Sequence, residues 1–114
     1  MPDFDMKIKE VNGVIVVTTN GYLNNYGGEK VASVCLQKIS EGKRKFLVNV
    51  EKTPMVNSIG VSILIEVIEE LQGTNGKIAF CNTVPIVEKT FNIMGLTKYS
   101  TVYYSEAEGL EGMA

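Results

Sequence analysis

The serine at position 58 stands where a polar loop gives way to a long apolar segment. In the stretch TPMVNSIGVSILIEVIEEL, residues 53–71, it follows Asn57 and precedes Ile59 and Gly60. A hydroxyl at such a junction has three uses: it caps the helix that begins there, it acts as a nucleophile, or it accepts a phosphate. Each use makes different demands on the rest of the chain.

A nucleophilic serine needs a base, and the sequence offers none of the usual type. The chain contains no histidine, so Ser-His-Asp and Cys-His arrangements are excluded and zinc loses its commonest nitrogen ligand. Glu51 and Lys52 lie near Ser58 in sequence, but no motif makes either of them a base. Cys35 and Cys81 are far apart among apolar neighbours, which predicts two buried free thiols. The sequence therefore predicts no enzyme, no metal and no other cofactor.

Charge and hydropathy narrow the range of partners. Eleven basic and 13 acidic residues leave a formal net charge of -2, and the densest basic cluster, residues 43–45, is interpreted as a solvated turn. Nucleic acid, which requires a concentrated basic surface, is not a predicted partner. No apolar run approaches the roughly 20 residues that span a bilayer, and the opening MPDFDMKIKE has no apolar signal core. We expect a cytoplasmic protein without a membrane span.

Hydrophobic periodicity divides the chain into strands and helices. Alternating and β-branched runs predict strands at residues 6–9, 14–19, 46–50, 77–81 and 101–104. Asn12-Gly13 predicts a hairpin between the first two. Apolar residues at three- and four-residue spacing predict helices at residues 29–41, 58–72 and 85–94.

Particular residues in these elements carry further expectations. The run 14–19 should be buried on both faces of the sheet. The third helix should turn four residues toward the core: Ile86, Val87, Phe91 and Met94. The segment 105–108, SEAE, has the spacing of a capping box, so a short helix should follow it. The turn NNYGGEK, residues 24–30, lacks phosphate-loop spacing and is interpreted as a flexible helix start.

The resulting order is β-β-α-β-α-β-α-β, with a small last helix. Alternation of strand and helix from the third strand onward demands a largely parallel sheet, and the opening hairpin makes that sheet mixed. The sequence thus predicts an α/β fold with about five strands and three to four helices, forming one domain over residues 1–114.

Four motifs support a resemblance to a known family. NGYLNNY (20–26) follows the second strand, KFLVNVEKTPMVNSIGVSIL (45–64) joins a strand through a loop to a helix, FNIMGL (91–96) ends the third helix, and SEAEGL (105–110) begins the last. In this order and in a chain of this length they resemble the STAS domain of the bacterial anti-sigma factor antagonists. The family has a Gly-Glu-Leu-Asp turn at the first motif and Asp-Ser-Ser-Gly or Asp-Ser-Thr-Gly within the second.

The resemblance implies that Ser58 is a phosphorylation switch. In that family the dephosphorylated protein binds an anti-sigma factor that is also a serine kinase, and this binding frees the sigma factor. Phosphorylation by the kinase ends the binding, and a phosphatase restores it. The positive end of a helix tolerates the added charge of about -1.5 to -2, whereas a close-packed partner surface does not.

The resemblance also implies a partner face around Ser58. We expect Asn57, Gly60 and Val61 to frame the serine, and Tyr22 and Tyr26 either to anchor the interface or to pack over the end of the sheet. The full set of predicted partner-binding residues is Tyr22, Asn24, Asn25, Tyr26, Asn57, Gly60, Val61, Ser62 and Glu66.

Departures from the family pattern leave alternatives open. Asn57 replaces the family's aspartate, Ile59 replaces a serine or threonine, and the turn at residues 20–24 lacks both family acids. A non-phosphorylated scaffold of a stress-signalling complex, or an accessory subunit that binds a transporter ATPase, is therefore an alternative function. Whether Asn57 or Ser58 caps the helix, and whether the chain forms a homodimer, also stay open.

Overall fold

A five-stranded mixed sheet organises the chain. The computed structural model describes residues 4–114, and its strands are β1 (Asp5–Val11), β2 (Val14–Asn20), β3 (Lys45–Lys52), β4 (Lys77–Cys81) and β5 (Val102–Tyr103). They lie side by side in sequence order. The pair β1 and β2 is antiparallel and each later pair is parallel. The predicted mixed, mostly parallel α/β fold is confirmed.

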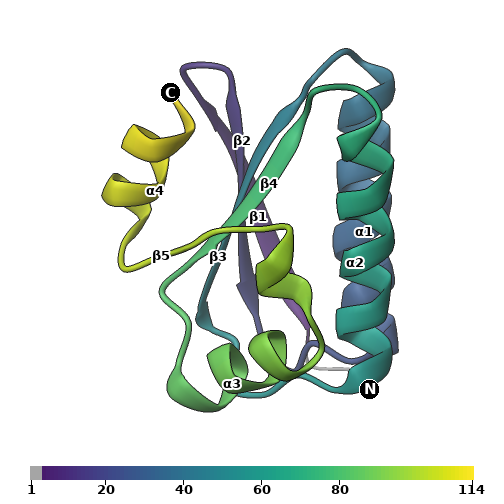
Figure 1. The fold of residues 1–114 in the computed structure, drawn as a ribbon, viewed down its shortest axis with the longest axis vertical. Helices are drawn as coiled ribbons and strands as arrows, with labels where there is room; N and C mark the ends of the chain where they lie inside the picture. Colours follow the sequence, from purple (N-terminus) through teal and green to yellow (C-terminus); the bar gives the residue numbers. More distant parts are fainter. Residues whose placement is uncertain (1–3) are drawn as a thin grey trace.

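Helices cover the two faces of the sheet unequally (Figure 1). On one face α1 (Asn25–Ser40) and α2 (Ser58–Gln72) run side by side, and on the other lies the short α4 (Glu106–Met113). Helix α3 (Pro85–Ile93) and the 3-10 turn η1 (Leu96–Lys98) lie toward the end where the parallel strands finish. That end also carries the starts of α1 and α2.

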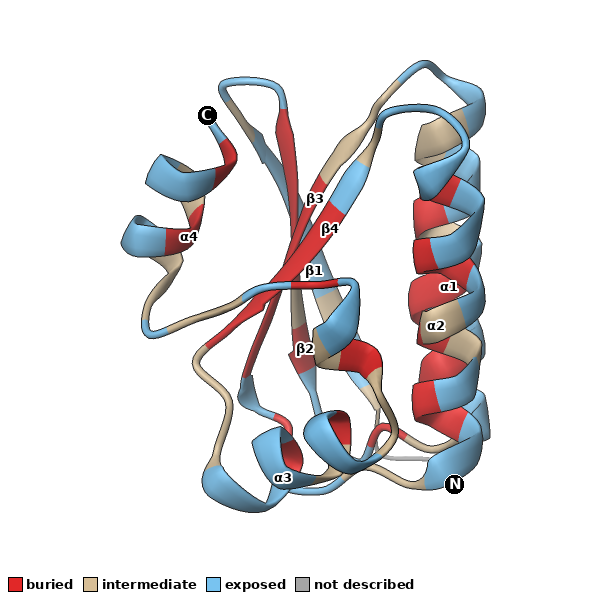
Figure 2. Ribbon diagram, in the orientation of Figure 1, coloured by how far each residue is buried: buried red, intermediate tan, exposed pale blue. Residues whose placement is uncertain are grey.

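The core forms on both faces because β2 and β3 each carry a run of consecutive apolar residues, 14–17 and 46–48, that alternate between the two faces (Figure 2). Ile15 and Val17 face α1 and α2, while Val14 and Val16 pack with Met113 of α4. These four residues are at most 2% exposed and Thr19 is buried, whereas Thr18 is half-buried, so the predicted burial of residues 14–19 is confirmed except at Thr18. Burying each such side chain contributes roughly 1.5–3 kcal/mol.

Helix α1 begins earlier than its apolar pattern predicts. It starts at Asn25 rather than Glu29, and both Gly27 and Gly28 lie buried inside it. Glycine weakens a helix by about 1 kcal/mol relative to alanine, but here it permits close packing: a Cβ on Gly28 would stand 3.1 Å from Gly60 Cα. Tertiary contact therefore overrides propensity, and the predicted start of this helix is four residues too late.

Helix α3 buries only part of its predicted face. Val87 and Phe91 are fully buried and Met94 packs against the core, as predicted. Ile86 is 58% exposed, so its predicted core contact is wrong. The reason is helical geometry: successive residues are separated by about 100°, and a helix of nine residues turns only the 87 and 91 positions inward.

The predicted terminal helix is confirmed, with a cap that differs slightly from the reciprocal box. Ser105 Oγ accepts a hydrogen bond from Glu108 N at 3.1 Å, whereas Glu108 Oε1 accepts from Tyr104 N at 3.0 Å, one residue earlier than the box requires. Gly109 lets α4 approach the sheet, because a Cβ there would lie 2.8 Å from both methyl carbons of Leu47.

Both thiols are buried and free, as predicted. Burial raises the pKa of Cys35 to about 12, and burial together with Glu106 and Glu51 raises the pKa of Cys81 to about 12. Neither is a thiolate at neutral pH, so neither is a reactive nucleophile. Within residues 4–114, every helix is too short or too polar to cross a bilayer.

Candidate partner-binding site

Two loops meet at the end of the sheet where β2 and β3 finish. Leu23 N donates a hydrogen bond to Met55 O at 3.0 Å, and Asn57 N donates to Leu23 O at 3.2 Å. Leu23 and Val56 thereby form an isolated parallel bridge that continues the β2–β3 pairing. This bridge brings the starts of α1 and α2 next to each other.

Asn57 is the N-cap of α2. Its side-chain Oδ1 accepts a hydrogen bond from Gly60 N at 2.8 Å, and its carbonyl accepts from Val61 N at 3.1 Å. Ser58 is the first helical residue and is exposed. Within residues 4–114 no hydrogen bond of its hydroxyl is recorded. The capping role therefore belongs to Asn57, and the Ser58 hydroxyl is accessible.

The start of α1 repeats the same arrangement. Asn24 Oδ1 accepts from Gly27 N at 3.0 Å, and Asn24 O accepts from Gly28 N at 2.7 Å. Placing the two caps in register aligns six consecutive positions. The aligned pairs are Tyr22 with Met55, Leu23 with Val56, Asn24 with Asn57, Asn25 with Ser58, Tyr26 with Ile59, and Gly27 with Gly60.

The two helix starts together form a surface with four large, exposed and mainly apolar side chains. Its large side chains occupy equivalent positions of the alignment: Tyr22 is 40% exposed, Met55 53%, Tyr26 38% and Ile59 56%. We call these four residues and Ser58 the switch surface. Large, partly exposed apolar side chains in a group are typical of protein interaction sites.

The helix starts touch because Gly60 has no side chain. A Cβ there would clash with Leu23 O and would stand 2.8 Å from Asn24 O. These are backbone atoms that cannot rotate away, so any larger residue must displace the loop. Gly60 therefore sets the distance between the two starts.

A hydrogen bond between two buried hydroxyls holds the loop that joins β3 to α2. Thr19 Oγ1 and Thr53 Oγ1 lie 2.6 Å apart, and both residues are fully buried. Thr53 N also donates to Val50 O at 3.0 Å. Because a buried hydroxyl without a partner costs about 1–3 kcal/mol, this pair favours one position of the loop.

The electrostatics of the switch surface are close to neutral. Neither α1 nor α2 has an acidic residue in its first turn, and both caps are uncharged asparagines. The partial positive charge of each helix start is thus not offset by a carboxylate. Lys30 Nζ lies 5.3 Å from the centre of the Tyr26 ring.

The predicted partner-binding residues fall into two groups, one buried or half-buried and the other exposed. Asn24 and Asn57 are half-buried caps, and Gly60 and Val61 are buried, so these four hold the helix starts and offer a partner little side-chain surface. The exposed members are Tyr22, Asn25, Tyr26, Ser58, Ser62 and Glu66.

Sequence reasoning did not predict that Met55 and Ile59 would be large exposed side chains beside Ser58 in the sequence. Ile59 stood out only as a departure from the family pattern, and Met55 not at all. An available signal was the presence of two large apolar residues in a loop and first turn where polar residues are usual.

The fold and this site define a class of protein. The family model described as the STAS domain matches residues 5–109, so the chain belongs to the STAS domain family.

Several known proteins are similar to it. The proposed anti-sigma factor antagonist BtrV of Bordetella bronchiseptica is 19% identical over 90 residues, which cover 79% of this chain and 78% of BtrV. An anti-sigma factor antagonist from Mycobacterium paratuberculosis superposes with a TM-score of 0.86 at 16% identity, over 97% of this chain and 94% of that one. The Bacillus cell fate determinant SpoIIAA, solved in its phosphorylated form, gives 0.77 at 20% identity, over 96% and 100%. At these identities the structures share the fold.

Proposed function

We propose that this protein is an anti-sigma factor antagonist whose binding is ended by phosphorylation of Ser58. Its partner in the proposal is an anti-sigma factor with serine kinase activity, and a phosphatase restores the binding form. One observation carries the proposal: the first residue of α2 exposes a hydroxyl for which the structure of residues 4–114 records no hydrogen bond, and the same helix start exposes Met55 and Ile59. The proposal places the protein in the cytoplasm, where sigma factors act.

The comparisons support the binding part of this proposal. The relatives named above include anti-sigma factor antagonists, and SpoIIAA has a phosphorylated form. A role as a binding protein rather than an enzyme also agrees with the absence of histidine from the sequence and with the protonated, buried thiols.

The geometry supplies a physical account of the switch. A phosphate on Ser58 would lie at the uncompensated positive end of α2, so the fold would tolerate it. The same phosphate would place about two negative charges among Met55, Ile59 and the two tyrosines. A partner packed against those side chains would have to bury that charge without a matching cation, which disfavours the complex.

Intact-mass analysis after incubation with the candidate kinase and ATP tests the proposal. We expect the wild-type protein to gain one phosphate and Ser58→Ala to gain none. Ser33→Ala is the control, since Ser33 is also an exposed helical serine and is not among the predicted partner-binding residues. It should be phosphorylated like the wild type. Phosphorylated protein should then fail to capture the kinase in a binding assay.

A second function is favoured by the neutral cap. The family's aspartate is absent at Asn57, and Ile59 is 56% exposed in place of a hydroxyl residue. Stable binding of a partner together with no phosphate gain would contradict the switch. That result would instead support a scaffold role in a signalling complex or a subunit role beside a transporter ATPase.

A further inference from the structure

The face of the sheet that carries α4 is only half covered. Helix α4 packs over Val14, Val16, Leu47 and Ala79, at the end near the β1–β2 turn. Beyond these residues the ends of β2 and β3 have no helix above them (Figure 1). A cavity of about 440 Å³ lies beside this open part, between β1 and the last residues of β2 and β3. Its walls are formed by Asp5, Met6, Lys7, Ile8, Lys9, Thr18, Thr19, Asn20 and Lys52.

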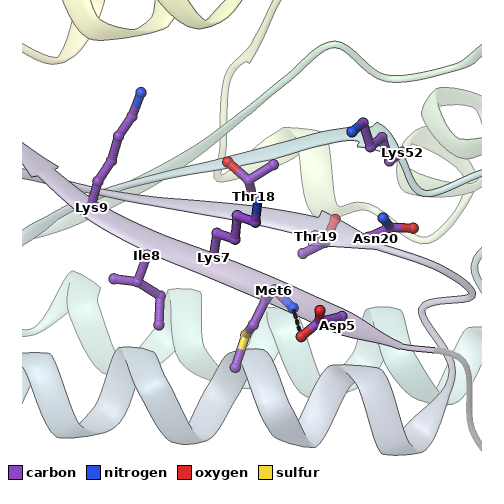
Figure 3. Close-up of a pocket in the computed structure, with 9 residues that line it drawn as sticks. All are labelled: Asp5, Met6, Lys7, Ile8, Lys9, Thr18, Thr19, Asn20 and Lys52. Atoms are coloured by element: carbon purple, nitrogen blue, oxygen red, sulfur yellow. Dashed lines mark hydrogen bonds between the residues drawn. The ribbon is translucent and has the colours of Figure 1, made fainter.

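Strand register gathers basic and polar side chains on this side. Lys7 lies opposite Thr18, and Asn20 lies opposite Lys52, so the members of each pair share a face of the sheet. Lys9, two residues after Lys7, falls on the same face. Figure 3 shows Lys7, Lys9, Thr18 and Lys52 on one side of the sheet. Met6 and Ile8 point to the other side, toward the helices.

The charges that line the cavity are mostly positive although the protein is acidic. Three of the four ionisable lining residues are lysines, whereas the whole chain has a net charge of -2. Lys9 Nζ contacts Glu106 Oε2 at 2.8 Å, and Asp5 Oδ1 accepts from Met6 N at 2.9 Å. The two carboxylates at this site are therefore already engaged.

Four donor groups of the lining have no recorded partner. Within residues 4–114 the structure records no hydrogen bond or ion pair of the side chains of Lys7, Thr18, Asn20 or Lys52. Elsewhere the same face is well paired: Asn49 Nδ2 donates to Glu106 Oε1 at 3.0 Å. Two ammonium groups, a hydroxyl and an amide that can all donate face one cavity, and such a set suits a ligand with several acceptor oxygens.

We propose that this cavity is a binding site for a small organic phosphate. A phosphate group offers the acceptor oxygens and the negative charge that Lys7 and Lys52 match. The cavity volume falls within the range of about 300–1,000 Å³ typical of small-molecule sites, so it has room for an organic group attached to the phosphate. The proposal does not rest on Ser58 or on the proposed function, because its residues lie on β1 and at the ends of β2 and β3.

Backbone amide NMR titration of the full chain tests the site. The probes are ribose 5-phosphate, inorganic phosphate and ribose, each compared with sodium chloride at equal ionic strength. We expect saturable shifts at Lys7, Thr18 and Lys52, with ribose 5-phosphate binding more tightly than inorganic phosphate and ribose not binding. The double variant Lys7→Gln, Lys52→Gln should weaken binding by about tenfold or more.

A matched control separates a site from general charge attraction. Lys77 and Lys98 are exposed and do not line the cavity, so Lys77→Gln, Lys98→Gln removes the same charge elsewhere. This variant should bind within about twofold of the wild type. Equal weakening in both double variants, or shifts that sodium chloride reproduces, would overturn the proposal. Binding of inorganic phosphate as tight as that of ribose 5-phosphate would overturn its organic part.

Discussion

The starts of α1 and α2 have the same backbone design and carry different chemistry. Each begins after an asparagine whose side chain accepts from the glycine N–H three residues on, at 3.0 Å for Asn24 and 2.8 Å for Asn57. The first helical residue is Asn25 in one and Ser58 in the other. The difference teaches that both starts share one backbone frame, whereas only α2 begins with a hydroxyl, the group that the proposed phosphorylation requires.

The two starts also differ in how tightly they pack. The equivalent glycines face different neighbours: a Cβ on Gly60 would meet carbonyl oxygens of the facing loop, while one on Gly27 would meet the Phe4 ring at 2.9 Å and Tyr22 O at 3.1 Å. A ring can turn, but two carbonyls of a paired loop cannot. The α2 start is therefore the more constrained of the two.

Substitution of alanine for Gly60 and Gly27 should have the largest effects on the free energy of unfolding, and the two effects should differ. We expect Gly60→Ala to lower the free energy of unfolding by about 3 kcal/mol and Gly27→Ala by about 1 kcal/mol, since only the former forces backbone apart. Urea denaturation followed by circular dichroism measures both. Gly73→Ala is the control, because nothing lies within 4 Å of its added Cβ, and it should not destabilise. Equal losses at positions 27 and 60 would break the comparison.

Aspartate substitutions at Ser58 and Asn25, the first residues of α2 and α1, should differ in their effect on partner binding. Ser58→Asp should weaken partner binding by about 2 kcal/mol, or roughly 30-fold, because it places a charge within the apolar surface. Asn25→Asp adds the same charge at the equivalent position of α1 and should weaken binding by no more than about threefold. Both proteins should still unfold cooperatively, since an acid is favourable at a helix start. Titration calorimetry with the partner would contradict the proposal if Asn25→Asp had the larger effect.

Removal of the caps should reveal what the two starts share. Asn24→Ala and Asn57→Ala should each lower the free energy of unfolding by about 1 kcal/mol, because each leaves one helix N–H without its acceptor. Thermal and urea unfolding provide the measurement. A loss at Asn57 alone would mean that the cap of α1 is not equivalent to that of α2.

Acid titration of the opposite face should have the smallest effect and should leave the helix starts unchanged. Hydrogen bonds from Lys9 and Asn49 hold the pKa of Glu106 below its ordinary value. Because the folded pKa is lowered, the stabilisation is present above the unfolded pKa and is lost as the pH falls through the folded pKa. Glu106→Gln should lower the free energy of unfolding by about 0.5–1 kcal/mol at neutral pH. It should also reduce the loss of stability that accompanies a fall in pH.

The control for this titration is Glu111→Gln, an exposed acid of the same helix. Urea unfolding measured across pH should show that this variant still loses stability as the pH falls. Partner binding should be the same in both variants, because α4 packs on the face of the sheet opposite α1 and α2. Reduced partner binding in Glu106→Gln alone would show that the two faces are coupled.

Local patterns in the chain were enough to predict most of the fold. The Asn12-Gly13 hairpin, the apolar stripe of α2 and the cap spacing at Ser105 each depend on neighbours in sequence, and each is confirmed. The start of α1 could not be predicted in this way. Gly27 and Gly28 disfavour a helix locally, but both occupy tight positions in the fold: a side chain at Gly28 would crowd Gly60, far along the chain, and one at Gly27 would crowd Phe4 and Tyr22.

The central residues of the candidate site could be predicted from the sequence, but the residues around them could not. Asn57 and Ser58 stand out because caps and hydroxyls at helix starts have a local signature. The contribution of Met55 depends on its loop pairing with Leu23, and the exposure of Tyr22 depends on the same pairing. Sequence separation hides such contacts, since strand-like pairing of two loops has no local signal of its own.

The sequence by itself determined the alternation of strands and helices, the exclusion of histidine chemistry and the presence of a serine beside a capping residue, because each follows from residue type and short-range spacing. Only the tertiary structure decided that two helix starts lie together, that these starts expose four large side chains, and that three lysines line one cavity. These arrangements depend on which backbone atoms approach across the fold. That approach is set by the close contact of Gly28 with Gly60 and by strand register, both of which join distant parts of the chain.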